Sequence, residues 1–230
     1  MFENLPGAIG HALRNARAGL DHIVFNSIDL RAGMSALTVT SLAFVDHGPL
    51  PAPYTADGEG LSPPLQWHGV PPGAGSLLLI VEDADAPTPR PLVHAIAVDL
   101  PAEDGSLPEG ALNRSADDDA GDAGGGTGAV VGPDLKIGRN SFLQTGWLPP
   151  DPPPGHGVHR YAFQLFALTA GPAFDGTPGR DVVVEALKER ALASGLLIGT
   201  YQRPDGSVKV GETASVVEPA VVPAGLSPAG

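Results

Sequence analysis

Gly155-His156-Gly157-Val158-His159-Arg160-Tyr161-Ala162-Phe163 joins a proline run at 149–154 to an apolar segment at 159–168. The composition of that segment predicts a β-strand. Because successive side chains of a strand alternate between its two faces, we expect His159, Tyr161 and Phe163 to lie on the same face. An imidazole, a phenol and an aromatic ring beside a stiff loop favour a pocket for a small ligand.

The composition around this stretch indicates a globular chain with many turns. The chain has 230 residues, of which 42% are hydrophobic, enough for one domain with a sizeable core. Its 31 glycines and 25 prolines favour short strands over long helices. The net charge of −13 argues against nucleic acid as a partner, because nucleic acid requires a basic surface.

The sequence also limits the compartment and the chemistry. It contains no cysteine, which excludes disulfides, thiolate catalysis and thiolate zinc sites. No run approaches the roughly 20 apolar residues of a membrane span, and the first residues lack the features of a secretory signal. We therefore expect a cytoplasmic protein without stable membrane insertion.

Periodicity places most of the remaining elements. Strand-like patterns occupy 37–45, 76–82, 94–99 and 196–203, and helical spacing occupies 6–20 and 181–194. The unbroken apolar run at 76–82 is typical of a strand buried on both faces. In the strand at 94–99, His94, Ile96 and Val98 are expected on one side. The chain is predicted to be mostly β with peripheral helices.

The order of these segments suggests a division of the chain. We expect a helical extension at 1–33, a main domain at 34–210 and a flexible tail at 211–230, with an acidic, glycine-rich insertion loop at 115–128. The apolar stripe of the first helix suits packing on the domain or on a second copy, which leaves a homodimer open.

Acidic residues follow the buried strand directly. Asp83 and Asp85 come at its end, where a carboxylate is costly unless it is hydrogen-bonded. Each could instead cap a turn through its own backbone. His94 and His159 could likewise be core histidines, and His156, between two glycines, is expected to be exposed to solvent.

Four motifs together resemble a known family. They are Ser62-Pro63-Pro64-Leu65-Gln66-Trp67, Asp83-Ala84-Asp85-Ala86-Pro87, the histidine-led strand that starts at Val93-His94, and Pro152-Pro153-Pro154-Gly155 followed by His159-Arg160-Tyr161. They occur in the order seen in the phosphatidylethanolamine-binding protein family, in particular its bacterial Raf-kinase-inhibitor-like branch. This sequence departs from the family pattern at Ala84, where a proline is usual, and at Asp99, where an asparagine is usual.

The resemblance implies a Greek-key β-sandwich-like domain with a C-terminal helix. It also implies a pocket for phosphate, phosphoethanolamine or a similar phospholipid head group. The ligand-binding residues carried over to this chain are Asp83, Asp85, Pro87, His94, Gly146, His159 and Tyr161. Gly146 begins a rim loop, 146–154, that also contains Trp147 and itself differs from the family pattern.

Such a pocket makes physical sense for an anion. Imidazole N–H groups, the Tyr161 hydroxyl and loop amides can donate hydrogen bonds to phosphate oxygens. Asp83 would orient one histidine and favour its charged form. Two histidinium ions could then hold an anion without Lys or Arg, so we expect a non-enzymatic binding protein that needs no cofactor, with a regulatory role open to it.

Three other functions remain open. An acid/base hydrolase or lyase could use Asp83 and His159, with Ser62 or Ser141 as nucleophile, although neither serine lies in a Gly-x-Ser-x-Gly elbow. His94, His159 and Asp83 could bind a metal, although no pair has His-x-x-x-His spacing. An inhibitor of a protease or kinase could act through the proline-rich rim at Trp147 on an unidentified protein partner.

Overall fold

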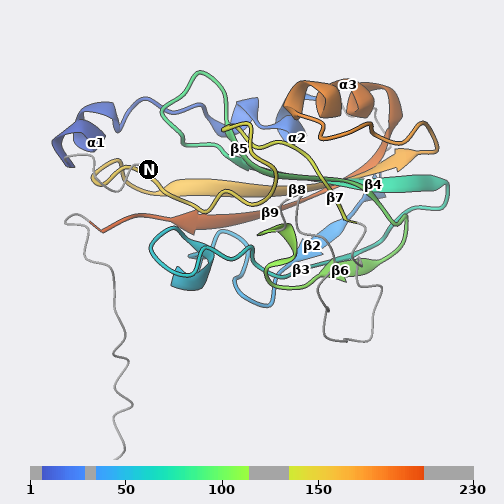
Figure 1. Ribbon diagram of the computed structural model, residues 1–230, viewed down its shortest axis with the longest axis horizontal. Helices are drawn as coiled ribbons and strands as arrows, with labels where there is room; N and C mark the ends of the chain where they lie inside the picture. Colours follow the sequence, from blue (N-terminus) through green and yellow to red (C-terminus); the bar gives the residue numbers. More distant parts are fainter. Residues whose placement is uncertain (1–6, 29–34, 114–134, 205–230) are drawn as a thin grey trace, which may run out of the picture.

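Two β-sheets face each other in the computed structural model, which describes residues 7–28, 35–113 and 135–204 (Figure 1). The larger sheet has the order β1 (Ser35–Ala36), β9 (Ala191–Tyr201), β8 (His159–Thr169), β4 (Ala74–Asp83), β5 (Leu92–Leu100) and β7 (Lys136–Ile137). The smaller sheet has the order β2 (Thr38–Thr40), β3 (Leu65–His68) and β6 (Gly105–Leu107). Apart from the parallel contact of β1 with β9, the strand pairs are antiparallel.

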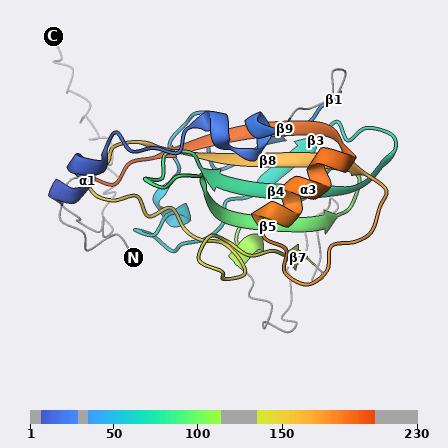
Figure 2. The ribbon, with the colours of Figure 1, turned by 90° about the horizontal axis from the view of Figure 1, so that it is seen from above.

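The helices are few and lie outside the sheets. They are α1 (Gly7–Leu13), α2 (Val24–Ser27) and α3 (Arg180–Arg190), with single 3-10 turns η1 (Leu20–His22), η2 (Ala52–Tyr54) and η3 (Ala111–Asn113). Figure 2 shows α3 over β4 and β5, and α1 beyond one end of the long strands. The predicted class, mostly β with peripheral helices, is confirmed.

The central strands β4, β5 and β8 are largely apolar because both of their faces are covered. One face packs on the smaller sheet in a core that includes Trp67, Val81 and Phe163. The other face packs under α2 and α3 in a second core that includes Ile80 and Phe166 (Figure 1). The prediction that 76–82 is a strand buried on both faces is therefore confirmed.

The first helix is shorter than its periodicity predicts. It ends at Leu13 instead of continuing to residue 20, and Ile9 and Leu13 of the expected apolar stripe are 41% and 39% exposed. The chain leaves the helix because the amides of Ala18 and Gly19 donate to the carbonyls of Ala86 and Ala84. These contacts tie the segment after α1 to the loop that follows β4.

Two other predicted elements are also too long. The strand expected at 37–45 is limited to β2, and the helix expected at 181–194 ends at Arg190. Ala191 pairs with Leu168, so the chain passes from helix to strand without a loop. Further along β9, Gly195 allows the strand to pass close to the backbone of Leu37, since a Cβ atom on this residue would lie 2.5 Å from the Leu37 carbonyl oxygen.

Parts of the expected division of the chain lie outside the described residues. These parts are residues 1–6 and 29–33 of the extension, residues 34, 114–134 and 205–210 of the main domain, which include the insertion loop at 115–128, and the tail at 211–230. The domain boundaries stay predictions.

Candidate functional site

A cavity of about 450 Å³ opens where β4 ends and where β5 and β8 begin. Asp83, the last residue of β4, pairs with Leu92 on one side and Tyr161 on the other. We call this space the histidine cavity, because His94 and His159 line it together with Asp83 and Pro87. Of the predicted site residues, Asp85, Gly146 and Tyr161 do not line it.

A β-bulge turns His94 toward this cavity. Val81 pairs with Ala95 and Glu82 pairs with Val93, which leaves His94 as the extra residue in β5. Its ring lies edge-on to Tyr161 with centroids 5.1 Å apart, on the side of the sheet opposite Ile96. The expectation that His94 shares a side with Ile96 is therefore wrong, because the bulge shifts the alternation.

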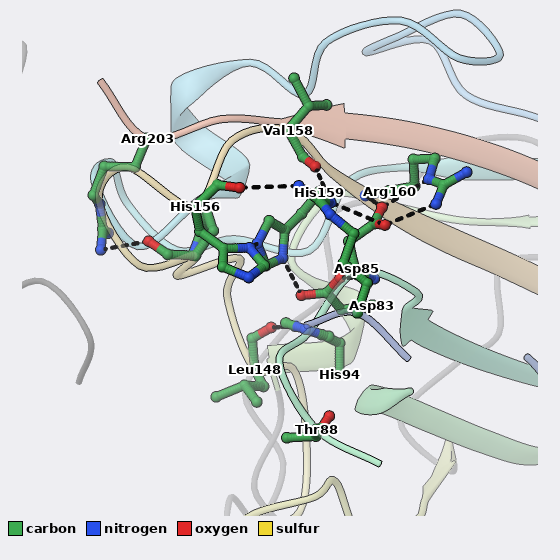
Figure 3. A network of polar contacts seen from close by, with 12 residues as sticks. Asp83, Asp85, Thr88, His94, Leu148, His156, Val158, His159, Arg160 and Arg203 are labelled. Carbon is green, nitrogen blue, oxygen red and sulfur yellow. Dashed lines mark hydrogen bonds and ion pairs between the residues drawn. The ribbon is translucent and has the colours of Figure 1, made fainter. Parts of the chain in front are cut away.

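His94 has one ring nitrogen bonded and one left over. Its Nδ1–H donates to the carbonyl oxygen of Leu148 at 2.5 Å, and the Leu148 amide donates back to the His94 carbonyl (Figure 3). Burial lowers the pKa of His94, and the charge of Asp83 offsets this only in part. A neutral ring that donates through Nδ1 has a lone pair on Nε2, which is buried and has no partner among the described residues.

The hydroxyl of Tyr161 is another buried polar group without a hydrogen-bond partner in the described structure. Burial, reinforced by the charge of Asp83, raises the pKa of Tyr161 well above its ordinary value, so the phenol keeps its proton. Its ring stacks on His159 with centroids 6.4 Å apart. The ring of His94, with an unused acceptor, thus lies beside the ring of Tyr161, with an unused donor.

A continuous chain of hydrogen bonds runs through the other two histidines (Figure 3). Asp83 Oδ2 lies 2.7 Å from His159 Nδ1, and His159 Nε2 lies 2.7 Å from His156 Nδ1. His156 Nε2 then lies 2.9 Å from the Leu13 carbonyl oxygen. His156 is only 1% exposed, so its predicted solvent exposure is wrong: Leu13 at the end of α1 and Arg17 after it both contact this residue.

The number of protons in this chain follows from its contacts. Each of the three contacts needs one proton, whereas two neutral imidazoles and a carboxylate supply only two. The third proton makes the group of Asp83, His159 and His156 neutral overall. Burial and the charge of His159 lower the pKa of His156, so a neutral His156 donates through Nε2 to the Leu13 carbonyl and accepts at Nδ1.

This arrangement differs from the expected pair of histidinium ions. His94 is neutral, and both ring nitrogens of His159 already contact protein groups. A ligand in the histidine cavity therefore meets one free imidazole lone pair, not two cations.

Asp85 faces away from the cavity toward two arginines. Arg160 binds its carboxylate through Nε and a terminal nitrogen, both at 2.7 Å, and Arg17 lies 3.0 Å away. Burial alone would raise the pKa of Asp85, but the hydrogen bonds from Arg160 and Arg17 outweigh burial and lower it. Arg17 also donates to the carbonyls of Val158 and His156. Asp85 thus fixes the loop that carries Asp83.

A buried arginine holds the rim of the cavity. Arg203, 2% exposed, pairs with Asp57 and with Asp151, and donates to the carbonyl of Pro152. Asp151 and Pro152 line the cavity. Sequence reasoning missed Arg203 and Arg17, since a lone arginine in an apolar or loop segment carries no signal of its distant partner.

The rim itself is less exposed than expected. Trp147 is 7% exposed and stacks on Phe163, so it is a core residue and not a contact for a partner. Gly146 has a φ of 96°, a conformation that favours glycine, and its carbonyl accepts a bond from Asn140. Pro152, Pro153 and Pro154 are buried as well.

The geometry gives little support to a metal site or to a serine nucleophile. Within the described ranges, no three His, Cys, Asp or Glu side chains are grouped so that they could hold a metal ion. The Ser62 hydroxyl accepts a bond from the Leu112 amide, and Ser141 accepts one from Val93. No helix in the part of the chain that the structure covers has the length and apolar character to cross a membrane.

Comparisons with known proteins agree with the architecture and the motifs. The family model described as phosphatidylethanolamine-binding protein matches residues 40–202. A UPF0098 protein of Methanothermobacter thermautotrophicus is 38% identical over 164 residues, which is 70% of this chain and 95% of the relative. A UPF0098 protein of Aquifex aeolicus is 32% identical over 186 residues, which is 80% of this chain and 99% of the relative.

Solved structures extend this similarity to the fold. A putative phosphatidylethanolamine-binding protein homologue of Chlamydia trachomatis superposes with a TM-score of 0.60 at 31% identity, covering 73% of this chain and 98% of its own. YbcL of E. coli, described as a new member of the mammalian family, superposes with a TM-score of 0.61 at 28% identity, covering 74% of this chain and 99% of its own. The chain belongs to the phosphatidylethanolamine-binding protein family.

Proposed function

We propose that this protein binds a phosphate monoester in its singly protonated form, with the phosphate in the histidine cavity. The single observation that carries the proposal is the buried, unpartnered Nε2 of His94, whose ring lies edge-on to that of Tyr161, which carries an unpartnered hydroxyl. A P–OH group can donate to the first, and a P–O⁻ oxygen can accept from the second. A buried polar group without a partner costs about 1–3 kcal/mol, and such a ligand would relieve that cost at both groups.

The residues that line the cavity favour a ligand with one negative charge over a ligand with two. Asp83 and Asp151 line it, and none of the described residues that line it is Lys or Arg. Tyr161 does not itself line the cavity, but its ring lies beside those of His94 and His159, which do. A dianion would meet the two carboxylates with no facing cation, whereas a monoanion that donates a proton meets a matching acceptor.

Binding is favoured over catalysis by the state of the acid/base pair. His159 lies between Asp83 and His156, and the chain ends at a backbone carbonyl instead of at the cavity. A general base must reach the proton that it removes, and His159 has no nitrogen left for this. His94 can accept a hydrogen bond, but the lowered pKa makes it a weak base.

An NMR titration of the histidine rings with inorganic phosphate and phosphoethanolamine tests the proposal. We expect saturable shifts of the His94 ring, and no shift of the exposed His68, which serves as an internal control. His94→Phe keeps an aromatic ring but removes Nε2, and should weaken binding about tenfold or more. Saturable binding with the same affinity in His94→Phe would contradict the proposal.

The pH dependence of binding provides an independent test. The second pKa of a phosphate monoester is about 6, so the monoanion becomes scarce as the pH rises above that value. Affinity should therefore fall about tenfold for each pH unit between pH 7 and pH 8. An affinity that rises over this interval would identify the dianion as the ligand and refute the proposed protonation state.

The setting that we propose is the cytoplasm, where a chain without cysteine suits the reducing environment. A homodimer through α1 is a further proposal, supported by the exposed Ile9 and Leu13. The molar mass in solution of the intact protein and of an Ile9→Ser variant tests it: a monomer in both cases removes the dimer from consideration.

A further inference from the structure

A second, larger cavity of about 740 Å³ adjoins the histidine cavity. Thr88, Leu92 and Phe142 line both spaces, so the two meet along a shared boundary. Figure 3 shows Thr88 near His94 and Leu148, on the side of the site where this boundary lies. We call the larger space the arginine groove, because Arg90, Arg139 and Arg180 line it.

The charge of the groove is opposite to that of the protein as a whole. The chain has 13 Lys and Arg against 26 Asp and Glu, yet three arginines and a single acidic residue, Asp181, line this one space. The histidine cavity next to it is lined by two aspartates and by no described arginine or lysine. A ligand that spans the boundary therefore meets positive charge only on the side of the groove.

The three arginines differ in how far their hydrogen-bonding capacity is used. Arg180 is held by Glu82 at 2.7 Å and by the His22 carbonyl, so it forms a fixed wall. Arg139 donates a hydrogen bond from Nε to the Thr177 carbonyl. Its terminal nitrogens have no hydrogen-bond partner among the described residues. Two guanidinium groups, those of Arg90 and Arg139, are therefore candidates for binding a ligand.

The contact between Arg90 and Asp181 does not close the groove. The two groups are 3.4 Å apart and their side chains are 68% and 84% exposed. An exposed ion pair of this kind contributes about 0–1 kcal/mol, so an incoming anion can replace it. The Arg90 guanidinium can then form the two parallel hydrogen bonds that suit a phosphate or carboxylate.

A short loop holds the boundary in place. The Asn140 side chain accepts bonds from the amides of Phe142 and Gln144, and Leu143 between them has a φ of 63°. Leu143 is 76% exposed and lines the groove, which adds an apolar surface beside the arginines. A molecule with two anionic ends joined by an apolar spacer therefore fits this site. One end would lie in each cavity, and the spacer would lie on the apolar surface between them.

We propose that the arginine groove is a second subsite of the same binding site, which selects ligands with a second anionic group beyond the phosphate held at His94. This inference rests on the proposed function. The phosphate monoester occupies the histidine cavity, the spacer crosses Thr88 and Phe142, and the second phosphate or carboxylate binds Arg90 and Arg139.

Two matched probes test the subsite: hexyl phosphate and 1,6-hexanediol bisphosphate, which differ by one phosphate group. We expect the bisphosphate to bind about tenfold more tightly by calorimetry, and the ratio of the two dissociation constants to fall to about one in the double variant Arg90→Gln, Arg139→Gln. Lys188→Gln removes a charge on the far part of α3 and should keep the wild-type ratio. The single variant Arg90→Gln should give an intermediate ratio, which guards against misfolding of the double variant.

The possible results separate the two proposals. A hexyl phosphate that binds and shifts the His94 ring, with no gain for the bisphosphate, overturns the subsite and leaves the proposed function intact. A gain that persists in the double variant also overturns the subsite. Failure of both probes to bind overturns the proposed function and, with it, this inference.

Discussion

His94 and His159 stand on neighbouring parts of one site and illustrate two uses of the same side chain. His159 has protein partners at both ring nitrogens, and its contacts belong to a chain that runs from Asp83 to the backbone of Leu13. His94 has one partner, the Leu148 carbonyl, and a buried lone pair that nothing described meets. The number of partners, and not the residue type, separates a histidine that stabilises the fold from one that can recognise a ligand.

The largest effect should come from breaking the satisfied histidine. His159→Gln cannot maintain both contacts, so either Asp83 or His156 is left as a buried polar group without its partner, at a cost of up to about 3 kcal/mol in the free energy of unfolding. Urea denaturation measures this cost. His68→Gln, at an exposed histidine 3.7 Å from Asp104, is the matched control and should change stability by less than about 0.5 kcal/mol. Equal losses of stability in His159→Gln and His68→Gln would mean that the two contacts of His159 do not stabilise the fold.

The pH dependence of the free energy of unfolding tests whether His94 is neutral in the folded protein. Its pKa in the folded protein is below its ordinary value because of burial, and the same direction applies to His156. The unfolded chain therefore binds more protons than the folded protein below about pH 6.5, and stability falls as the pH is lowered through this range. The slope can reach about 1.4 kcal/mol per pH unit for each such histidine.

His94→Phe removes one of these two groups. Denaturation at pH 7.5, 6.5 and 5.5 should show a shallower loss of stability in this variant than in the wild type. An unchanged slope would mean that His94 is already protonated in the fold, which the proposed acceptor role does not allow.

The smallest effect should come from Tyr161. Tyr161→Phe removes a hydroxyl that has no partner in the described structure, so stability should change by less than about 0.5 kcal/mol. Affinity for phosphate should fall severalfold if this hydroxyl donates to the ligand, as calorimetry can measure. A clear loss of stability in the variant would show that the hydroxyl has a structural partner after all.

The sequence predicted the parts of this protein that depend on local pattern. β4 follows from its unbroken apolar run and β5 and β8 from their strand-like composition, and the motifs around Asp83, His94 and His159 led to the correct family and to one shared cavity. Short strands at the sheet edges and the ends of helices were less predictable, because tertiary pairing, as of Ala191 with Leu168, sets their limits.

Details that depend on distant partners could not be predicted. The bulge at His94 is a matter of register between β4 and β5, and no local pattern encodes it. The contact that His156 makes with Leu13, the last residue of α1, joins positions 143 residues apart in the chain. The Gly-His-Gly turn three residues before His159 was nevertheless a usable signal, since two histidines at that spacing can meet across a tight turn.

The contact of the Leu13 carbonyl with His156 has a consequence for any shortened form of this protein. Leu13 lines the histidine cavity, although it lies outside the span, 40–202, that the family model matches. A fragment chosen by family boundaries would keep Asp83, His94 and His159 but lose one wall of the cavity and the acceptor that orients His156. Ligand preferences measured on such a fragment would describe a wider, differently protonated opening than the one that the whole chain presents.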